Sequence, residues 1–313
     1  MSGLQGRAAM IRGSSRTLPV VLALLCAWCV PSAAQEMEPR AYSPSPVGTT
    51  FFLATFARST GGILTDPSLP VDDVEAGIDT VALGIGHTFS FFGRSAGLAI
   101  LQPRSSGHFT GTLNGEDAEA SRSGIGDTRL RFSANILGAP ALTAAEFARR
   151  TPRTTLGASL TVSAPTGEYH GDKLVNIGTN RWAIKPEIGV SHPVGKWSLE
   201  LTAGTWLFED NDDFFGGQRR EQEPLASVQA HVGYTFRPRL WLAFNAIFYD
   251  GGRSTIEGIE RDDRQSNTRY GLTLSLPVAG SQSVKLHWND GASTRFGSDF
   301  TTWGVTWQYT RLR

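Results

Sequence analysis

Residues 302–309, TWGVTWQY, carry a large apolar side chain at every second position. Successive side chains of a β-strand point to opposite faces, so one face collects Trp303, Val305, Trp307 and Tyr309. The other face collects Thr302, Gly304, Thr306 and Gln308. In a soluble sandwich the apolar face would pack in a core, whereas in a membrane barrel it would face lipid.

The same alternation recurs upstream. It is clear in residues 156–162, 197–203, 228–236 and 272–276, and it is blurred in residues 49–58 and 95–102. After residue 48 the chain divides into about twelve such segments. They span residues 49–58, 77–92, 95–106, 126–137, 153–165, 181–193, 196–208, 224–236, 239–250, 268–278, 282–290 and 299–311.

The connections between these segments are short and long in turn. Tight turns fall at Gly93-Arg94, Val194-Gly195, Arg237-Pro238 and Gly280-Ser281, and the long loops cover residues 59–76, 107–125, 166–180, 209–223, 251–267 and 291–298. One short-side connection, residues 139–150, reads as a brief helical turn. The predicted fold over residues 49–313 is all-β: a transmembrane antiparallel β-barrel of about twelve strands, with short periplasmic turns and long extracellular loops.

Aromatic residues gather near the predicted strand ends. Rings of this kind favour membrane interfaces, and the alternative is that they pack a soluble core. The set comprises Phe51, Phe52, Phe89, Phe91, Trp182, Trp197, Trp241, Tyr249, Trp303 and Tyr309.

The first 34 residues have the order of a secretory signal peptide. Three arginines precede an apolar run over residues 18–30, which is too short to span a bilayer, and SAA at residues 32–34 supplies small residues for cleavage. We therefore expect cleavage after Ala34, a periplasmic N-terminal segment over residues 35–48, and localisation in the cell outer membrane.

Removal of this signal takes away both cysteines and three of the 29 basic residues, which leaves 279 residues with a net charge of −3. The mature chain then depends on no disulfide, and the C-x-x-C spacing of Cys26 and Cys29 has no redox or metal meaning. A near-neutral charge argues against nucleic-acid binding.

Several short motifs follow one another across nearly the whole mature chain. They are SPVG at residues 45–48, DPSLP at 66–70, GIGD at 124–127, GAPAL at 138–142, SAPTGEY at 163–169, NIGTNRW at 176–182 and KPEIG at 185–189. This ordered set resembles the outer-membrane family labelled "putative meta-pathway of phenol degradation". The resemblance implies a Gram-negative outer-membrane barrel associated with uptake of aromatic or other hydrophobic compounds.

The end of the chain departs from this resemblance. Barrels of the type usually end on an aromatic residue that the assembly machinery reads, whereas this chain ends YTRLR at residues 309–313. Either Tyr309 serves from a slightly internal position, or assembly is less conventional.

Extending the alternation inward predicts ten polar side chains that face the lumen. Mixed charges there can pair across the lumen and plug it, or line a path and tune selectivity. A barrel of about twelve strands is narrow enough for long side chains to meet, which favours pairing. The ten are Arg129, Arg131, Lys185, Glu187, Glu200, Gln229, His231, Asn245, Lys285 and His287.

The predicted outer loop over residues 209–223 contains EDNDD followed by FFGG. Its candidate residues are the acids Asp210, Asp212 and Asp213 and the exposed aromatic pair Phe214 and Phe215. Oxygen-rich clusters can hold calcium, but the EF-hand spacing is missing, so a solvated acidic loop is favoured. The aromatic pair can capture a hydrophobic ligand or contact lipid headgroups. His170 and Asp172 are too few for a metal site, and no metal is expected.

An enzymatic barrel is a remote alternative. The stretch HWNDG at residues 287–291 resembles the His-x-Ser-Asn-Gly stretch of outer-membrane phospholipases. Such an enzyme needs a serine activated by a histidine, and Asn289 stands where that serine should be. No residue is therefore assigned a catalytic role.

The sequence thus predicts an outer-membrane channel or transporter for passive uptake of small hydrophobic or aromatic compounds, which is not an enzyme and needs no cofactor. The alternative is a plugged structural or surface-binding barrel without transport. Expected partners are outer-membrane lipid, the barrel-assembly machinery and the solute, with no nucleic acid.

Overall fold

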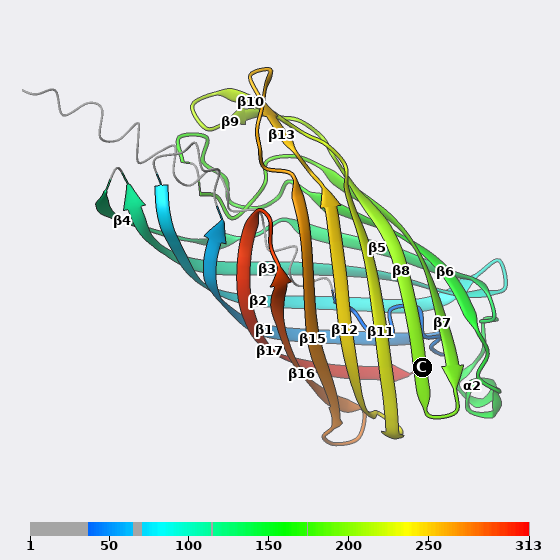
Figure 1. Ribbon diagram of the computed structural model, residues 1–313. Helices are drawn as coiled ribbons and strands as arrows, with labels where there is room; N and C mark the ends of the chain where they lie inside the picture. Colours follow the sequence, from blue (N-terminus) through cyan, green and yellow to red (C-terminus); the bar gives the residue numbers. More distant parts are fainter. Residues whose placement is uncertain (1–36, 65–70, 114, 174, 313) are drawn as a thin grey trace, which may run out of the picture.

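The computed structural model describes residues 37–64, 71–113, 115–173 and 175–312, and twelve of its strands form one closed antiparallel barrel (Figure 1). The last strand pairs with the first from Thr49↔Leu312 to Leu64↔Gly297, which closes the wall. The predicted barrel of about twelve strands is confirmed. In order around the wall the strands are β1 (Thr49–Leu64), β2 (Val71–Phe91), β3 (Arg94–Leu113), β5 (Thr128–Leu137), β6 (Thr155–Ala164), β7 (Ala183–Val194), β8 (Trp197–Phe208), β11 (Leu225–Arg237), β12 (Leu240–Gly251), β15 (Gln265–Pro277), β16 (Gln282–Ser293) and β17 (Gly297–Leu312).

Apolar side chains cover the outside of the barrel and polar side chains line the inside. In β17, Trp303 is 65% exposed whereas its neighbour Thr302 is 0% exposed, as the alternation predicts. An apolar outer face and a polar inner face are the reverse of a soluble protein and typical of a membrane barrel. Two of the aromatic residues expected at membrane interfaces, Trp241 and Tyr249, are instead buried on the inner face. They share the inward positions of β12 with Asn245.

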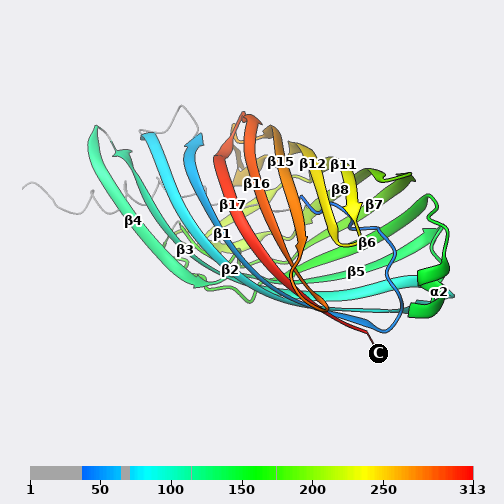
Figure 2. The same ribbon diagram turned by 90° about the horizontal axis from the view of Figure 1, so that it is seen from below.

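The barrel wall is taller on one side, where β1, β2 and β3 continue past the rim (Figure 1, Figure 2). There β3 pairs first with β5 along residues 96–101, and then with an added strand, β4 (Glu116–Ile125), along residues 104–113. Strand therefore replaces much of the loops predicted over residues 59–76 and 107–125. The sequence of β4, EDAEASRSGI, lacks an apolar alternation, which explains why it was not predicted.

A second, four-stranded sheet lies at this long-loop end of the barrel (Figure 1). It consists of β9 (Asn211–Phe214), β10 (Gln218–Gln222), β13 (Ser254–Ile256) and β14 (Ile259–Glu260). The loops predicted over residues 209–223 and 251–267 meet here, because β10 pairs with β13. Pairing between two distant loops is not encoded in a local sequence pattern, so the sequence predicted only irregular structure.

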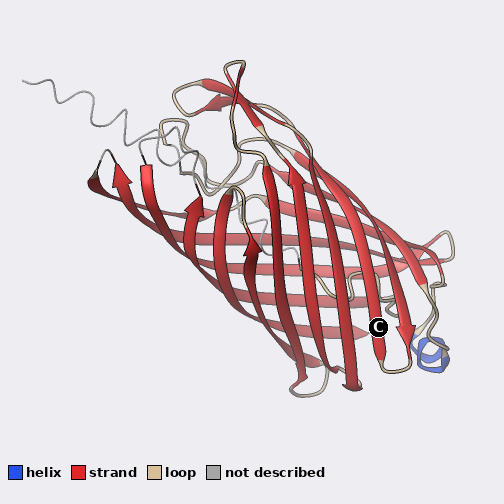
Figure 3. Cartoon of the chain, in the orientation of Figure 1, coloured by secondary structure: helices blue, strands red, loops and turns tan. Residues whose placement is uncertain are grey.

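The opposite, short-turn end carries a single described helix, α2 (Ala144–Arg149), in the connection between β5 and β6 (Figure 3). It lies within the predicted helical turn. Thr143 and Glu146 form a capping box, in which Glu146 accepts a hydrogen bond from the Thr143 backbone N–H at 2.8 Å. Within the described residues, no helix is long and apolar enough to cross a membrane.

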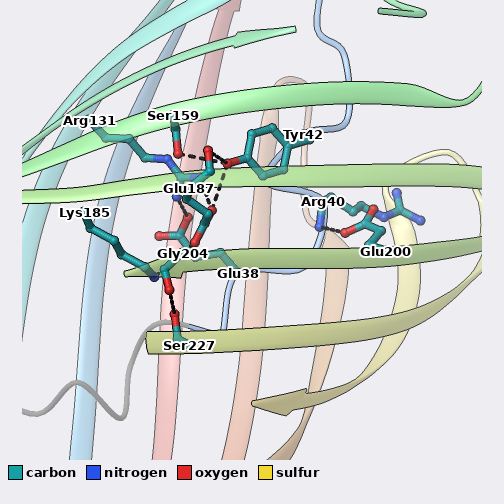
Figure 4. A network of polar contacts seen from close by, with 10 residues as sticks. All are labelled: Glu38, Arg40, Tyr42, Arg131, Ser159, Lys185, Glu187, Glu200, Gly204 and Ser227. Atoms are coloured by element: carbon teal, nitrogen blue, oxygen red, sulfur yellow. Dashed lines mark hydrogen bonds and ion pairs between the residues drawn. The ribbon is translucent and has the colours of Figure 1, made fainter. Parts of the chain in front are cut away.

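The segment before β1 runs inside the barrel. We expected residues 35–48 in the periplasm, but residues 38, 40 and 42 contact inward-facing side chains of the wall (Figure 4). Their hydrogen-bonding groups match those of the lumen, which accounts for the difference. The expected signal peptide over residues 1–34 and the terminal Arg313 lie outside the described residues.

Candidate functional site

The ten polar residues predicted to face the lumen occupy the inward positions of their strands. Outward neighbours such as Ile184, Leu199 and Val228 are exposed. Six of the ten are buried, namely Lys185, Glu187, Glu200, Gln229, His231 and Asn245. The other four are partly exposed, namely Arg129, Arg131, Lys285 and His287.

Glu187 on β7 is the centre of a charged network in the lumen (Figure 4). Its Oε2 atom lies 3.0 Å from Nζ of Lys185, and its Oε1 atom lies 3.1 Å from Nη2 of Arg131 on β5. The Tyr42 hydroxyl group donates a hydrogen bond to the same Oε1 atom at 2.9 Å. A buried carboxylate is tolerated only with such partners, so these four side chains form one interdependent unit.

The N-terminal segment, defined here as residues 37–48, is tied to several strands by alternate residues. Glu38 pairs with Arg131 at 2.7 Å. The Arg40 backbone N–H donates to Oε2 of Glu200 on β8 at 2.6 Å, and its guanidinium group lies 4.5 Å from the ring centroid of Trp241 on β12. The segment therefore occupies part of the lumen and contacts strands that are distant from β1 around the barrel wall.

Tyr42 fits into a notch made by two glycines. It is 3% exposed, and its ring lies over Gly157 on β6 and Gly189 on β7. A Cβ atom at either glycine would come within 2.3 Å of the Tyr42 ring. Real Cβ atoms essentially never approach so closely, so the missing side chains are what admit this ring.

Other inward polar residues join neighbouring strands. His231 Nδ1 lies 2.9 Å from Asn245 Oδ1, and Asn245 Nδ2 donates to Thr273 Oγ1 at 3.0 Å, which links β11, β12 and β15. Asn289, at the nucleophile position of the phospholipase-like stretch, accepts a hydrogen bond from Arg269 Nη2 at 3.0 Å. These contacts join neighbouring strands of the barrel wall.

An aromatic cluster interrupts the polar lining near the long-loop end. It consists of the buried side chains of Trp206, Leu225, Ile247, Tyr249 and Ala183, with Phe208 packed against them, and Met37 of the N-terminal segment also contacts it. Trp206 has the same parity on β8 as inward-facing Glu200, so the alternation could have indicated its direction. The arrangement gives the lumen an apolar surface, and a second buried cluster, which includes Ile63, Phe109 and Phe300, provides another.

The outer-loop candidates differ in their surroundings. Asp210 and Asp212 pair with the exposed Arg219, which matches a solvated acidic loop. We expected Phe214 and Phe215 to be exposed, but Phe214 is only 7% exposed and Phe215 is half-buried. The cause is the pairing of β9 with β10, which turns Phe214 inward. The guanidinium carbon of Arg220 lies 5.5 Å from the centroid of the Phe214 ring. Within the described residues there is no group of three potential metal ligands.

A family comparison identifies the chain. Residues 71–304 match the family described as "Putative MetA-pathway of phenol degradation". The chain belongs to this family. A search of curated protein sequences gives no match.

Solved structures with the same fold include an outer membrane channel and an autotransporter domain. An outer membrane channel from Pseudomonas putida aligns with a TM-score of 0.73 and 23% sequence identity, covering 88% of this chain and all of that one. The beta domain of the Bordetella autotransporter Brka aligns with a TM-score of 0.51 and 10% identity, covering 84% of this chain and 99% of that chain. At these identities the likeness establishes the fold.

Proposed function

We propose that this protein is an outer-membrane channel for passive uptake of small hydrophobic or aromatic compounds. The observation that carries the proposal is the aromatic cluster, because Trp206 and Tyr249 place aromatic rings among the polar side chains that line the lumen. Weak binding sites along a pore are sufficient for diffusion down a gradient. The description of the family, which refers to phenol degradation, supports an aromatic solute.

The location follows from the same features. An apolar outer face with residues such as Leu201 and Phe244 exposed suits lipid rather than water. Export by a cleaved signal peptide and insertion by the barrel-assembly machinery belong to this proposal.

The N-terminal segment favours a second candidate, a plugged barrel without transport. Its contacts with Arg131, Glu187 and Glu200 place protein where a solute would pass. The two candidates agree on the architecture and differ on whether the folded protein conducts.

Planar-bilayer recording of the mature protein tests both candidates. A channel gives discrete conductance steps, and removal of residues 35–43 enlarges them. If neither protein conducts, and neither carries an aromatic sulfonate into liposomes, the channel proposal is wrong and the plugged barrel stands. Phospholipid hydrolysis that is lost in His287→Ala would instead support a lipid hydrolase.

A further inference from the structure

Two arginines at the long-loop end of the lumen have hydrogen-bond donors without partners. Arg181, immediately before β7, is 7% exposed, and its Nη1 atom is buried without a hydrogen-bond partner. Arg220 on β10 has a buried Nε atom in the same condition. Neither guanidinium group forms a salt bridge with a carboxylate of the described residues. Buried N–H groups of this kind normally have partners, so the pair lacks an acceptor.

The nearby carboxylates do not supply that acceptor, because other groups occupy them. Asp210, for example, pairs with Arg219 at 2.5 Å. Asp127 accepts hydrogen bonds from the backbone N–H groups of Gly167 and Thr179, both at 2.9 Å, and from the Thr179 hydroxyl at 2.6 Å. Asp263 accepts from the backbone N–H of Ser254 at 2.7 Å and from its hydroxyl. These acids make the local electrostatic potential more negative, but they accept no hydrogen bond from Arg181 or Arg220 within the described residues.

A guanidinium group keeps its proton in proteins, so both arginines are cationic at neutral pH. Burial and, secondarily, the positive charge of Arg220 lower the pKa of Arg181 to about 9, which is still above neutral pH. Burial also lowers the pKa of Arg220. Two cations held close together, one buried and one half-buried, are unfavourable unless an anion compensates them. Gln222 is a neutral partner of Arg181 and does not provide that compensation.

The arginine pair is continuous with the aromatic cluster. The Arg181 guanidinium group lies 4.6 Å from the ring centroid of Phe208. The Phe208 ring in turn stacks with the Trp206 ring, and their ring centroids lie 6.5 Å apart. Cationic donors and apolar rings therefore form one surface, with the charge toward the long-loop end and the rings deeper in the lumen.

We propose that Arg181 and Arg220 bind the carboxylate group of a single-ring aromatic acid whose ring lies against Trp206 and Tyr249. The planar guanidinium group matches a carboxylate with two parallel hydrogen bonds. Met37 now contacts the aromatic cluster, and its unbranched, flexible side chain is one that an incoming ring can displace. This inference rests on the proposed channel function and specifies the class of solute.

Equilibrium dialysis of the purified mature protein in detergent tests the site, with radiolabelled benzoate as the probe. Benzamide has the same ring without the charge, and acetate has the charge without the ring. We expect benzoate to bind at least about tenfold more tightly than either. Equal binding of benzoate and benzamide would overturn the proposal.

Substitutions locate the site. Arg181→Gln and Arg220→Gln each weaken benzoate binding about tenfold or more, because each removes charge-assisted hydrogen bonds. Arg264→Gln is the matched control, since Arg264 also lies near the long-loop end but is exposed and paired with Asp250; it leaves binding unchanged. If one variant fails to fold, the other still decides. Equal losses in Arg264→Gln and Arg220→Gln would contradict the assignment.

The proposed binding site and the proposed channel function can be refuted independently of each other. Loss of conductance with benzoate binding intact would refute the channel and leave the site. Conductance without any binding of benzoate would refute the site and leave the channel.

Discussion

The hydroxyl group of Tyr42 lies 2.9 Å from Oε1 of Glu187, and this hydrogen bond joins the segment before β1 to β7 across the lumen. Around the wall, β7 is separated from β1 by β2, β3, β5 and β6 on the shorter side. The contact therefore bridges the barrel rather than following its wall. It makes the N-terminal segment the first feature to test in a transport assay.

Tyr42→Ala is expected to increase single-channel conductance, because it removes the largest buried side chain that the segment places among β6 and β7. Tyr42→Phe keeps the ring in its notch and should stay near the wild-type conductance. Planar-bilayer recording of both variants makes the measurement. An equal increase in both would show that the hydroxyl group, not the ring, holds the segment in place.

Gly189→Ala should reproduce the effect of Tyr42→Ala. A Cβ atom at residue 189 would lie 2.3 Å from the Tyr42 ring and push the segment out of its notch. Gly86→Ala is the control, since its Cβ atom would meet only ordinary contacts at 3.5 Å. The double variant Gly189→Ala/Tyr42→Ala should conduct no more than either single variant, because both act through one contact. Additive conductance changes would disprove the shared notch.

Glu187→Ala is expected to reduce the free energy of unfolding by about 3–5 kcal/mol, since it leaves two cations without their buried carboxylate. Lys185 and Glu187 have side chains only 5% and 6% exposed. Asp79→Ala breaks the exposed pair with Arg58 and should change stability by about 1 kcal/mol or less. Urea unfolding in lipid vesicles, followed by tryptophan fluorescence, compares the two. Similar losses would mean that the lumen is wet enough to screen the Glu187 network.

Asp127→Asn should loosen the connection between β6 and β7 without unfolding the barrel. An amide has a single acceptor oxygen and would turn N–H donors toward the N–H groups of Gly167 and Thr179. The loss of charged hydrogen bonds is worth about 1.5–3 kcal/mol. Limited proteolysis should cut this loop faster in Asp127→Asn than in Asp172→Asn, where the residue is exposed. Equal cutting rates would exclude Asp127 as the anchor of the loop.

The alternation of side chains was sufficient to predict the barrel and the faces of most strands. Trp303 and Thr302 illustrate this, because one is outside and the other inside at consecutive positions. The pattern also indicates inward direction for Glu187 and Glu200. It carries no information on which inward groups meet, and the pairing of Glu187 with Arg131 depends on the register of three strands.

The N-terminal segment and the arginine pair could not be predicted from the sequence. Tyr42 has no periodic neighbours, and its position depends on the missing side chains of Gly157 and Gly189, which lie more than a hundred residues away. Arg181 and Arg220 come from different loops. Their proximity follows from the contact of Arg181 with Gln222 on β10, which depends on the tertiary fold.

The N-terminal segment also has a mechanical consequence. It continues covalently into β1, and it is bonded through Arg40 and Tyr42 to β8 and β7 on the other side. A cylinder of strands under lateral pressure flattens most easily along an unsupported diameter. This segment spans such a diameter and supports it from inside. Removing the segment to open the lumen would therefore also remove the support that keeps the cross-section of the barrel round.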